Sequence, residues 1–321
     1  MHTRDRGIIL ISVLLIVLLL SSVAVLIGNN YLISLKRASF LEFQTISLNM
    51  FRNIESLALK KIDLELKFNN QYLNKENPLL SDNFVFDLDS GRIVSEISDA
   101  SVCFNINSIV TKGDDNFIEN KKSTEAFRKL MSLYEVDNNI VEEAIDQIID
   151  WIDYDSNPRA YGLEDYYYSG PLNNPKEYTG KRLFISVNEL KGIPAIRKID
   201  WNIINNNFCA HQQNENFSFN INSINLKDSY LLSSLFPNID ITDAEYIITY
   251  MPKEGVRTLA ELSKLFPSRD FTSPNGRIDF SSRSFLLSSK ITFEDFTSES
   301  YSNIYYVNNN SYIVSRIYNG I

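Results

Sequence analysis

The residues best suited to chemistry lie close together in segment 150–165. Its oxygen donors, in chain order, are Asp150, Asp153, Asp155, Asn157, Glu164 and Asp165. Hard cations such as calcium take roughly six to eight oxygen ligands, several of them anionic, from a loop that curls around the ion. When Asp153 is counted as position 1, the three donors after it fall at positions 3, 5 and 12, which is the ligand spacing of an EF-hand. We therefore expect a calcium ion here, with the backbone carbonyl of Arg159 at position 7 and with Asp150 and Asp165 as further candidate ligands.

One feature of this loop departs from the EF-hand pattern. Pro158 stands at position 6, where Gly normally makes the sharp turn, and Gly162 comes only later. The alternative interpretation is a solvated acidic turn that caps a helix ending at Ile152. Calcium is preferred, because carboxylates held this close together repel one another without a cation.

The other residues that could carry chemistry are few. The histidines are His2 and His211, so a Ser-His-Asp triad or a two-histidine zinc site would have to be built around one residue. The sequence also lacks a Gly-rich phosphate loop, and we expect no enzymatic activity. Cys103 and Cys209 are available to pair if this part of the chain is exported, and two buried free thiols are the alternative.

Bulk composition narrows the class of protein. With 321 residues, 44% of them hydrophobic, the chain has enough apolar material for one large core or two modest ones. The formal net charge is −9, and no stretch clusters Lys and Arg. Nucleic-acid binding needs such clusters to neutralise phosphates, so we expect no nucleic-acid partner.

The N-terminus combines a short charged tip with a long apolar run. The tip, Met1–Arg6, is followed by Gly7, and the next twenty residues, Ile8–Ile27, contain no charge, Gly or Pro. That length crosses a bilayer as a helix. The tip is too short and charged, and the apolar run too long, for an ordinary secretory signal. A cut after Gly7 would leave Ile8 as the new N-terminus, whereas a plain signal anchor, the alternative, would keep its tip.

Hydrophobic periodicity predicts the helices and strands of the chain. No Pro or Gly interrupts 29–68, so we expect one helix from Ile8 to about Phe68. Its apolar face comprises Phe43, Ile46, Met50, Ile54 and Leu57. Strands are predicted at 83–88, 92–97 and 102–106, with a hairpin turn at 89–91. Further strands are predicted at 282–294, 300–307 and 312–318, with a turn at 308–310.

A mostly helical insertion is expected between these two groups of strands. Amphipathic patterns predict helices at 124–134, 139–152, 228–236, 242–250 and 259–266. The six residues Phe104–Ile109 recur as Phe219–Ile224, each time before a helical block, so two related units are expected. The second unit looks like a helix-hairpin-helix DNA-binding module. Its turn at 236–240 lacks the Gly that lets backbone N–H groups approach phosphate, which favours a packing module.

The acidic segment also carries a family resemblance. The residue order in 150–167, followed by Ile185–Ile193 and the repeat at Phe219, is similar to the general secretion pathway protein K family, the large minor pseudopilins of type II secretion systems. The N-terminus resembles the type IV prepilin class, to which pseudopilins belong. This implies that a prepilin peptidase cleaves after Gly7 and methylates Ile8. Ser12 holds the fifth mature position, where most pseudopilins carry Glu, and the K-type family shares this absence. Cys103 and Cys209 match cysteines common in the family.

The fold class implied is α+β. It is a type IV pilin-like fold, in which a long N-terminal transmembrane helix packs on an antiparallel sheet, interrupted by a large all-helical domain. The expected divisions are a prepilin leader at 1–7, the helix at 8–77 with its transmembrane half at 8–27, strands at 78–109, the inserted domain at 110–269 and C-terminal strands at 270–321.

The resemblance also implies a function. A minor pseudopilin of this type acts at the tip of the periplasmic pseudopilus, initiates its assembly and supports export of folded proteins across the outer membrane. The implied partners are the I and J minor pseudopilins, the major pseudopilin and the prepilin peptidase. The chain would cross the bacterial inner membrane once, with its C-terminal domain in the periplasm. The alternative is a signal-anchored periplasmic receptor whose helical domain binds a small ligand.

Overall fold

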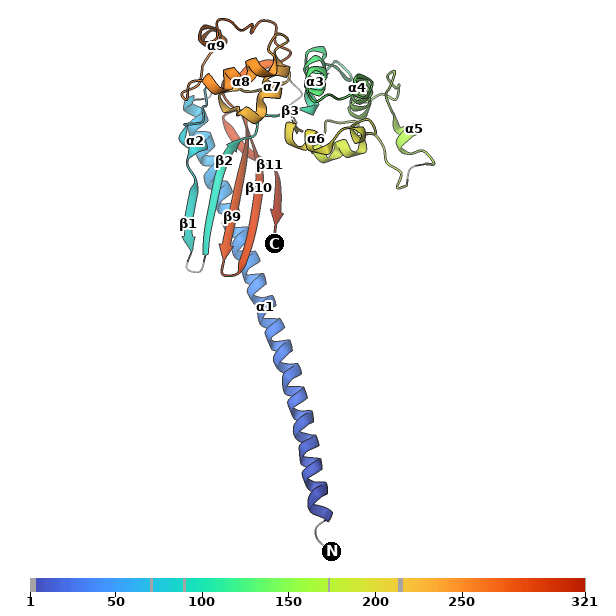
Figure 1. The fold of residues 1–321 in the computed structure, drawn as a ribbon, viewed down its shortest axis with the longest axis vertical. Coiled ribbons are helices and arrows are strands. Elements are labelled where there is room, and N and C mark those ends of the chain that lie inside the picture. The colour runs from blue at the N-terminus through green and yellow to red at the C-terminus, as the bar shows by residue number, and fades with distance from the viewer. Residues whose placement is uncertain (1–3, 70–71, 89–90, 173, 213–215, 321) are drawn as a thin grey trace.

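The computed structural model describes residues 4–69, 72–88, 91–172, 174–212 and 216–320. Helix α1 (Arg4–Asn69) projects alone in its N-terminal half, and its C-terminal half lies along a five-stranded antiparallel sheet (Figure 1). An insertion sits at the end of the sheet far from the N-terminus. This is the α+β, pilin-like arrangement expected from the sequence.

Helix α1 has two halves of different character. Every residue from 10 to 38 is exposed, and among the described residues α1 is the one helix long and apolar enough to cross a membrane. Beyond them one face is buried against the sheet, through Phe43, Phe51, Ile54, Ala58, Ile62 and Leu66. The single long helix is confirmed, but Leu57 is 42% exposed. It stands one position before Ala58 and therefore lies off the buried face.

The sheet joins strands from both ends of the chain. Its order is β1 (Phe84–Leu88), β2 (Gly91–Asp99), β9 (Ser284–Phe293), β10 (Phe296–Val307) and β11 (Asn310–Asn319). Strand β2 pairs with β9 from Gly91 opposite Phe293 to Asp99 opposite Phe285. A short helix, α2 (Pro78–Ser81), precedes β1, with Pro78 in its first turn where no N–H is needed. These strands agree with the expected ones, while residues 89–90 of the expected hairpin turn lie outside the described residues.

The turn between β10 and β11 was also expected. Asn308 and Asn309 have φ values of 50° and 64°. A two-residue hairpin whose twist matches its strands needs positive φ at both positions, and Asn tolerates that conformation better than most residues.

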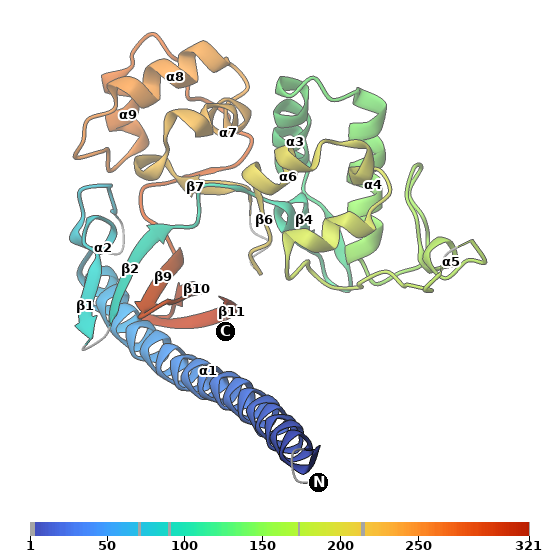
Figure 2. The ribbon, with the colours of Figure 1, turned by 60° about the horizontal axis from the view of Figure 1, so that its bottom comes forward.

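The insertion forms two lobes beyond the sheet (Figure 2). The first contains β3 (Phe104–Asn105), β4 (Val110–Lys112), β5 (Phe117–Glu119), α3 (Lys121–Leu133), α4 (Asn138–Ile152), α5 (Asp165–Tyr168), α6 (Trp201–Asn207) and β6 (Phe208–Cys209). The second contains β7 (Ser218–Asn220), α7 (Ser229–Leu235), α8 (Ile241–Tyr250), α9 (Leu259–Leu265) and β8 (Arg277–Asp279). Short 3-10 helices lie at Ile106–Ile109, Val187–Gly192, Ile196–Lys198, Ile221–Ser223 and Leu226–Asp228.

The repeated hexapeptide has the same structure in both lobes. Each copy is a short strand followed by a 3-10 helix, and each strand pairs in parallel with the last strand of its lobe. Asn107 donates to the carbonyl of Phe184 and accepts from its N–H, at 2.9 and 2.8 Å. Asn222 makes the same two contacts with Val256, at 2.9 and 2.8 Å. The expectation of two related units is therefore confirmed by their hydrogen bonds as well as by their sequences.

Three details of the insertion differ from the sequence-based expectations. The strand predicted at 102–106 is only β3, which pairs with β6 and does not join the main sheet, because the chain turns away after Asp99. The limits 110–269 are too narrow, since the closing pairs β3 with β6 and β7 with β8 extend the insertion on both sides. The domain is also not all-helical, because the described residues include three two-stranded sheets within it.

Polar contacts fix the position of α1 on the sheet. Glu55 is 3% exposed, and its carboxylate accepts from Ser302 Oγ at 2.7 Å and from Arg316 Nε at 2.9 Å. Asp63, two turns further along α1, accepts the N–H of Ser311 at 2.6 Å. A buried carboxylate is tolerated only where charge and hydrogen bonds compensate its lost hydration. Only one sliding position of α1 along β10 and β11 provides these partners.

We predict unequal effects when the two halves of this ion pair are removed. Glu55→Ala should lower the free energy of unfolding by about 2 kcal/mol, because the half-exposed Arg316 can be solvated by water. Arg316→Ala should cost more, about 3 to 5 kcal/mol, because it leaves a buried carboxylate without its cation. Denaturant unfolding of the full chain in detergent measures both values, and Glu42→Ala on the exposed face of α1 is the control. Equal losses, or a smaller loss for Arg316→Ala, would contradict this account.

Candidate metal centre

Two helices fix the ends of the acidic loop. Helix α4 ends at Ile152, and the N–H of Asp153 still donates to the carbonyl of Ile149. Glu164 occupies the N-cap position of α5. Trp151, the penultimate residue of α4, packs edge-on against Tyr168 of α5 with ring centres 5.2 Å apart. The loop between the two helices is thus closed by an apolar contact beneath it.

Three carboxylates converge within this loop, and we call Asp153, Asp155 and Glu164 the acidic cluster. Each offers one oxygen within 4.8 Å of the others. Glu164 is only 1% exposed and Asp153 only 6%. Both carboxylate oxygens of Glu164 and Oδ1 of Asp153 are buried with no hydrogen-bond partner among the described residues. Buried polar atoms in native proteins nearly always have a partner, so these oxygens make the cluster a candidate cation site.

The carboxylates of the acidic cluster also have raised pKa values. Burial, followed by the nearby negative charge of Asp150, raises the pKa of Glu164 to about 7. Burial and the carboxylate of Asp155 raise the pKa of Asp153 to about 6. Protein groups alone therefore do not compensate the charged forms of these residues. A divalent ion would reverse both shifts, since its own charge is the largest in such a site.

Two other predicted ligands, Asp150 and Asp165, are hydrogen-bonded to other parts of the protein. Asp150 accepts the N–H of Arg159 at 3.1 Å, and a Cβ on Gly162 would come within 1.8 Å of Asp150 Oδ2. Gly162 is therefore required by the close packing of the loop on Asp150. Asp165 accepts from both the N–H and the hydroxyl of Thr179, at 2.8 and 2.7 Å.

Two further expected donors lie in the loop itself. Asn157 is exposed, and its N–H donates to Asp155 Oδ1 at 2.8 Å. The carbonyl of Arg159 accepts the N–H of Gly162 at 3.1 Å. The buried part of the site thus comprises Asp153 and Glu164, with Asp155 at its exposed side.

Sequence reasoning missed several residues that hold the loop. Asn116, in the turn between β4 and β5, accepts the N–H of Tyr154 at 2.7 Å and donates to Asp155 Oδ2 at 2.9 Å. Lys181 donates to the carbonyl of Asp155 and to Ser156 Oγ, both at 3.3 Å. The guanidinium of Arg159 reaches Asp146 and Glu119, at 2.7 and 2.6 Å. No spacing rule could identify them, because Asn116 and Lys181 come from distant parts of the chain.

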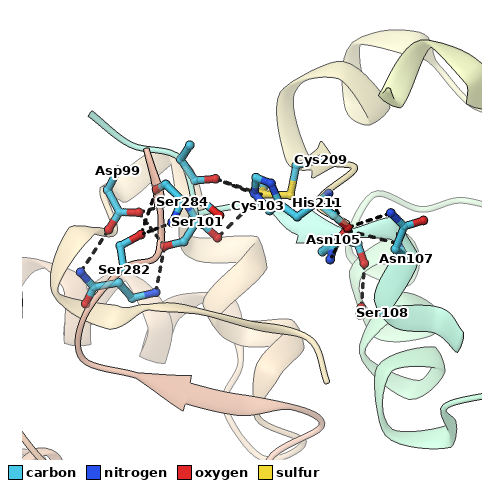
Figure 3. The surroundings of a disulfide bond; sticks show 12 residues. Asp99, Ser101, Cys103, Asn105, Asn107, Ser108, Cys209, His211, Ser282 and Ser284 are labelled. Atoms are coloured by element: carbon cyan, nitrogen blue, oxygen red, sulfur yellow. Dashed lines mark hydrogen bonds between the residues drawn. A yellow bond between two sulfur atoms is a disulfide. The ribbon is translucent and has the colours of Figure 1, made fainter. Parts of the chain in front are cut away.

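The remaining predicted site residues lie elsewhere. Cys103 and Cys209 form a disulfide with Cα atoms 5.8 Å apart, which joins the two ends of the first lobe (Figure 3). His211 lies beside it, with Nε2 3.6 Å from Cys103 Sγ. Burial lowers the pKa of this histidine, which favours its neutral form. Gly7 and Ile8 both fall within the first turns of α1.

Comparisons with known proteins agree with this architecture. The family model "Type II secretion system (T2SS), protein K" matches residues 102–211, which include the disulfide and the acidic loop. The type II secretion system protein K of Aeromonas hydrophila is 26% identical over 81% of this chain and 81% of its own length. That of Pectobacterium carotovorum is 30% identical over 56% of this chain and 55% of its own length.

A solved structure shares the fold. It is a chain from the GspK-GspI-GspJ complex of the enterotoxigenic Escherichia coli type 2 secretion system, with a TM-score of 0.74 and 21% identity. The match covers 88% of this chain and 99% of that one. The helix, the sheet and the insertion are therefore shared as one architecture. In its family model, its relatives and its fold, this chain is similar to type II secretion system protein K.

Proposed function

We propose that this minor pseudopilin occupies the tip of a periplasmic pseudopilus, where it initiates assembly and supports export of folded proteins across the outer membrane. The observation that carries the proposal is the position of the insertion. It covers the end of the sheet opposite the projecting half of α1 (Figure 1). In a filament whose subunits stack along their N-terminal helices, a subunit placed above this one would collide with the insertion. A tip position avoids that collision.

The proposed partners follow from the same architecture. The structural relative was solved in a complex with GspI and GspJ, and we propose the corresponding minor pseudopilins as partners of this chain. The exposed apolar half of α1 would first lie in the inner membrane and then pack among the helices of the major pseudopilin. Arg4 and Arg6 favour a cytoplasmic tip, which would leave the acidic bulk of the chain in the periplasm.

Site-specific labelling of assembled filaments tests the tip position. A fluorescent or gold label on the insertion should appear at one end of each pseudopilus, and the chain should be scarce relative to the major subunit. A label on the major subunit is the control and should mark the whole length. Uniform incorporation of this chain along the filament would contradict the proposal.

We also propose that a prepilin peptidase processes the chain after Gly7 and methylates Ile8. Mass spectrometry of the native protein should find a mature N-terminus at methylated Ile8. Gly7→Leu should block the cut, because the side chain occupies the cleavage position, and the protein should accumulate uncut in the inner membrane. Gly28→Leu is a matched control, since Gly28 lies in α1 with open space around it. A native protein that retains Met1 would instead favour the signal-anchored receptor.

We propose that the acidic cluster holds calcium. Support comes from the unpartnered buried oxygens of Asp153 and Glu164 and from the convergence of three carboxylates. Oxygen-only donors favour a hard cation, and a loop supplying several carboxylates suits calcium better than magnesium, which keeps most of its water. The ion would neutralise the cluster and connect the end of α4 to the start of α5. No reaction is required of it, and its role would be structural.

Calcium should stabilise the full chain in detergent. At about a hundred times the dissociation constant, binding to the folded state alone adds roughly 2.7 kcal/mol to the free energy of unfolding. Glu164→Gln and Asp155→Asn should remove most of that gain. Asp114→Asn is the matched control, because Asp114 is exposed in the adjacent β4–β5 turn. An unchanged unfolding midpoint with calcium and with chelator, together with no bound ion in elemental analysis, would show that the cluster is a solvated helix cap.

A further inference from the structure

A polar cavity lies where the two lobes meet the sheet. Its volume is about 350 Å³, which is at the lower end of the range for small-molecule sites. The first lobe contributes His211 to its lining, and the second lobe contributes Arg257 and Arg277. The residues just before β9 contribute Arg283 and the serines beside it. The cavity thus joins three parts of the chain that are far apart in sequence.

The charges of this lining do not cancel. Arg277 is ion-paired at 3.0 Å with Asp279, which also lines the cavity. Burial lowers the pKa of His211, which favours the neutral ring. Arg257 and Arg283 form no ion pair within the part of the chain that the structure describes. Its described residues therefore give the lining two uncompensated positive charges, although the whole chain carries a formal net charge of −9.

Arg257 is held in place with its donors available. It follows Val256, whose N–H and carbonyl are bound by Asn222 at 2.8 and 2.9 Å. Its guanidinium lies over the ring of Tyr72, with Cζ 4.7 Å from the ring centre. Such stacking uses the flat face of the guanidinium and leaves the N–H groups at its edge free to donate. The arginine is therefore positioned before any ligand arrives.

Arg283 and Ser281 supply further donors. The carbonyl of Arg283 accepts the N–H of Tyr306 at 2.8 Å, so the sheet fixes its backbone, while its side chain is exposed along the cavity. Ser281 lines the same cavity, and its Oγ is buried without a hydrogen-bond partner in the described ranges of the chain. Buried hydroxyls nearly always have a partner, and a ligand oxygen would supply one here.

The first lobe shows that the repeated unit does not require an arginine at the position of Arg257. In each lobe an asparagine of the hexapeptide binds the backbone of one distant residue. The residue that follows is Ile185 in the first lobe and Arg257 in the second. The same closure is thus made with an uncharged side chain, so the positive charge in the second lobe is not needed for folding.

We propose that this cavity binds one phosphate dianion, free or as a small phosphomonoester, through Arg257, Arg283 and Ser281. The two positive charges match the charge of a phosphate group near neutral pH, since its second pKa is about 6. Guanidinium groups bind phosphate through pairs of parallel N–H···O bonds, and the serine hydroxyl donates to a further oxygen. A carboxylate has a single charge and two oxygens, so it would leave one arginine uncompensated.

Isothermal titration of the full chain in an uncharged detergent tests this proposal. The buffer is freed of divalent cations, so that calcium cannot link phosphate to the acidic cluster. Inorganic phosphate or glycerol 3-phosphate should bind at one per chain, and acetate at least about tenfold more weakly, because it lacks the contacts with one arginine. Tighter binding of glycerol 3-phosphate identifies a phosphomonoester as the ligand, and otherwise it is the free ion. No binding of either phosphate, or equally tight binding of acetate, overturns the proposal.

Variants identify the residues that bind the phosphate. Arg283→Gln should weaken phosphate binding at least about tenfold, because charge-assisted hydrogen bonds are lost. Arg283→Lys keeps the charge without the paired donors and should lose less. Arg92→Gln makes the same change of charge at the end of β2 far from the insertion and is the matched control. Unchanged binding by Arg283→Gln would contradict the assignment.

A measurement on the parent chain does not depend on how the variants fold. Phenylglyoxal modifies accessible arginines, and peptide mass spectrometry gives the rate at each one. Saturating phosphate should slow modification of Arg257 and Arg283 and leave the rate at the exposed Arg92 unchanged. Equal rates at Arg257 and Arg283 with and without phosphate would also overturn the proposal.

Discussion

The pairing of β2 with β9 is the constraint on which the rest of the structure depends. These strands lie on either side of the whole insertion, and their register brings Asp99 opposite Phe285. The N–H of Ala100 then donates to the carbonyl of Ser284, so the insertion leaves and re-enters the sheet at one point. Because its two ends meet, the insertion adds no strain to the pilin-like core, and α1 can still bury its apolar face on an uninterrupted sheet. The whole insertion therefore lies at that end of the sheet, far from the N-terminus.

Duplication explains how so large an insertion is stabilised. Each lobe is closed by a parallel pair of very short strands, which would contribute little alone. Asn107 and Asn222 extend these closures by pairing both backbone groups of one distant residue, Phe184 or Val256. An amide side chain is suited to this role because it carries a donor and an acceptor side by side. The repeat therefore preserves a pair of hydrogen bonds as well as an apolar pattern, which explains why Asn107 recurs as Asn222.

The sequence predicts most of the regular elements and little of their pairing. Helix α1, the amphipathic helices of the insertion and the β10–β11 turn follow from local periodicity and from residues that accept positive φ. Strand β3 is two residues long, and its partner β6 lies about a hundred residues away, so only tertiary contacts select it. In the acidic loop, spacing identifies Asp153, Asp155 and Glu164. Spacing cannot show that Asp165 is hydrogen-bonded to Thr179, because Thr179 comes close only in the folded chain.

The first lobe carries the disulfide and the acidic cluster. The second lobe has the same hexapeptide and closing strand pair but uses Ser218 and Asp279 at the cysteine positions. The first lobe also includes a long segment between α4 and Val187 in which the described residues form no helix or strand other than α5. Irregular chain buries little apolar surface for the conformational entropy that it loses on folding. A cross-link therefore contributes most in this lobe, where the disulfide joins the two ends.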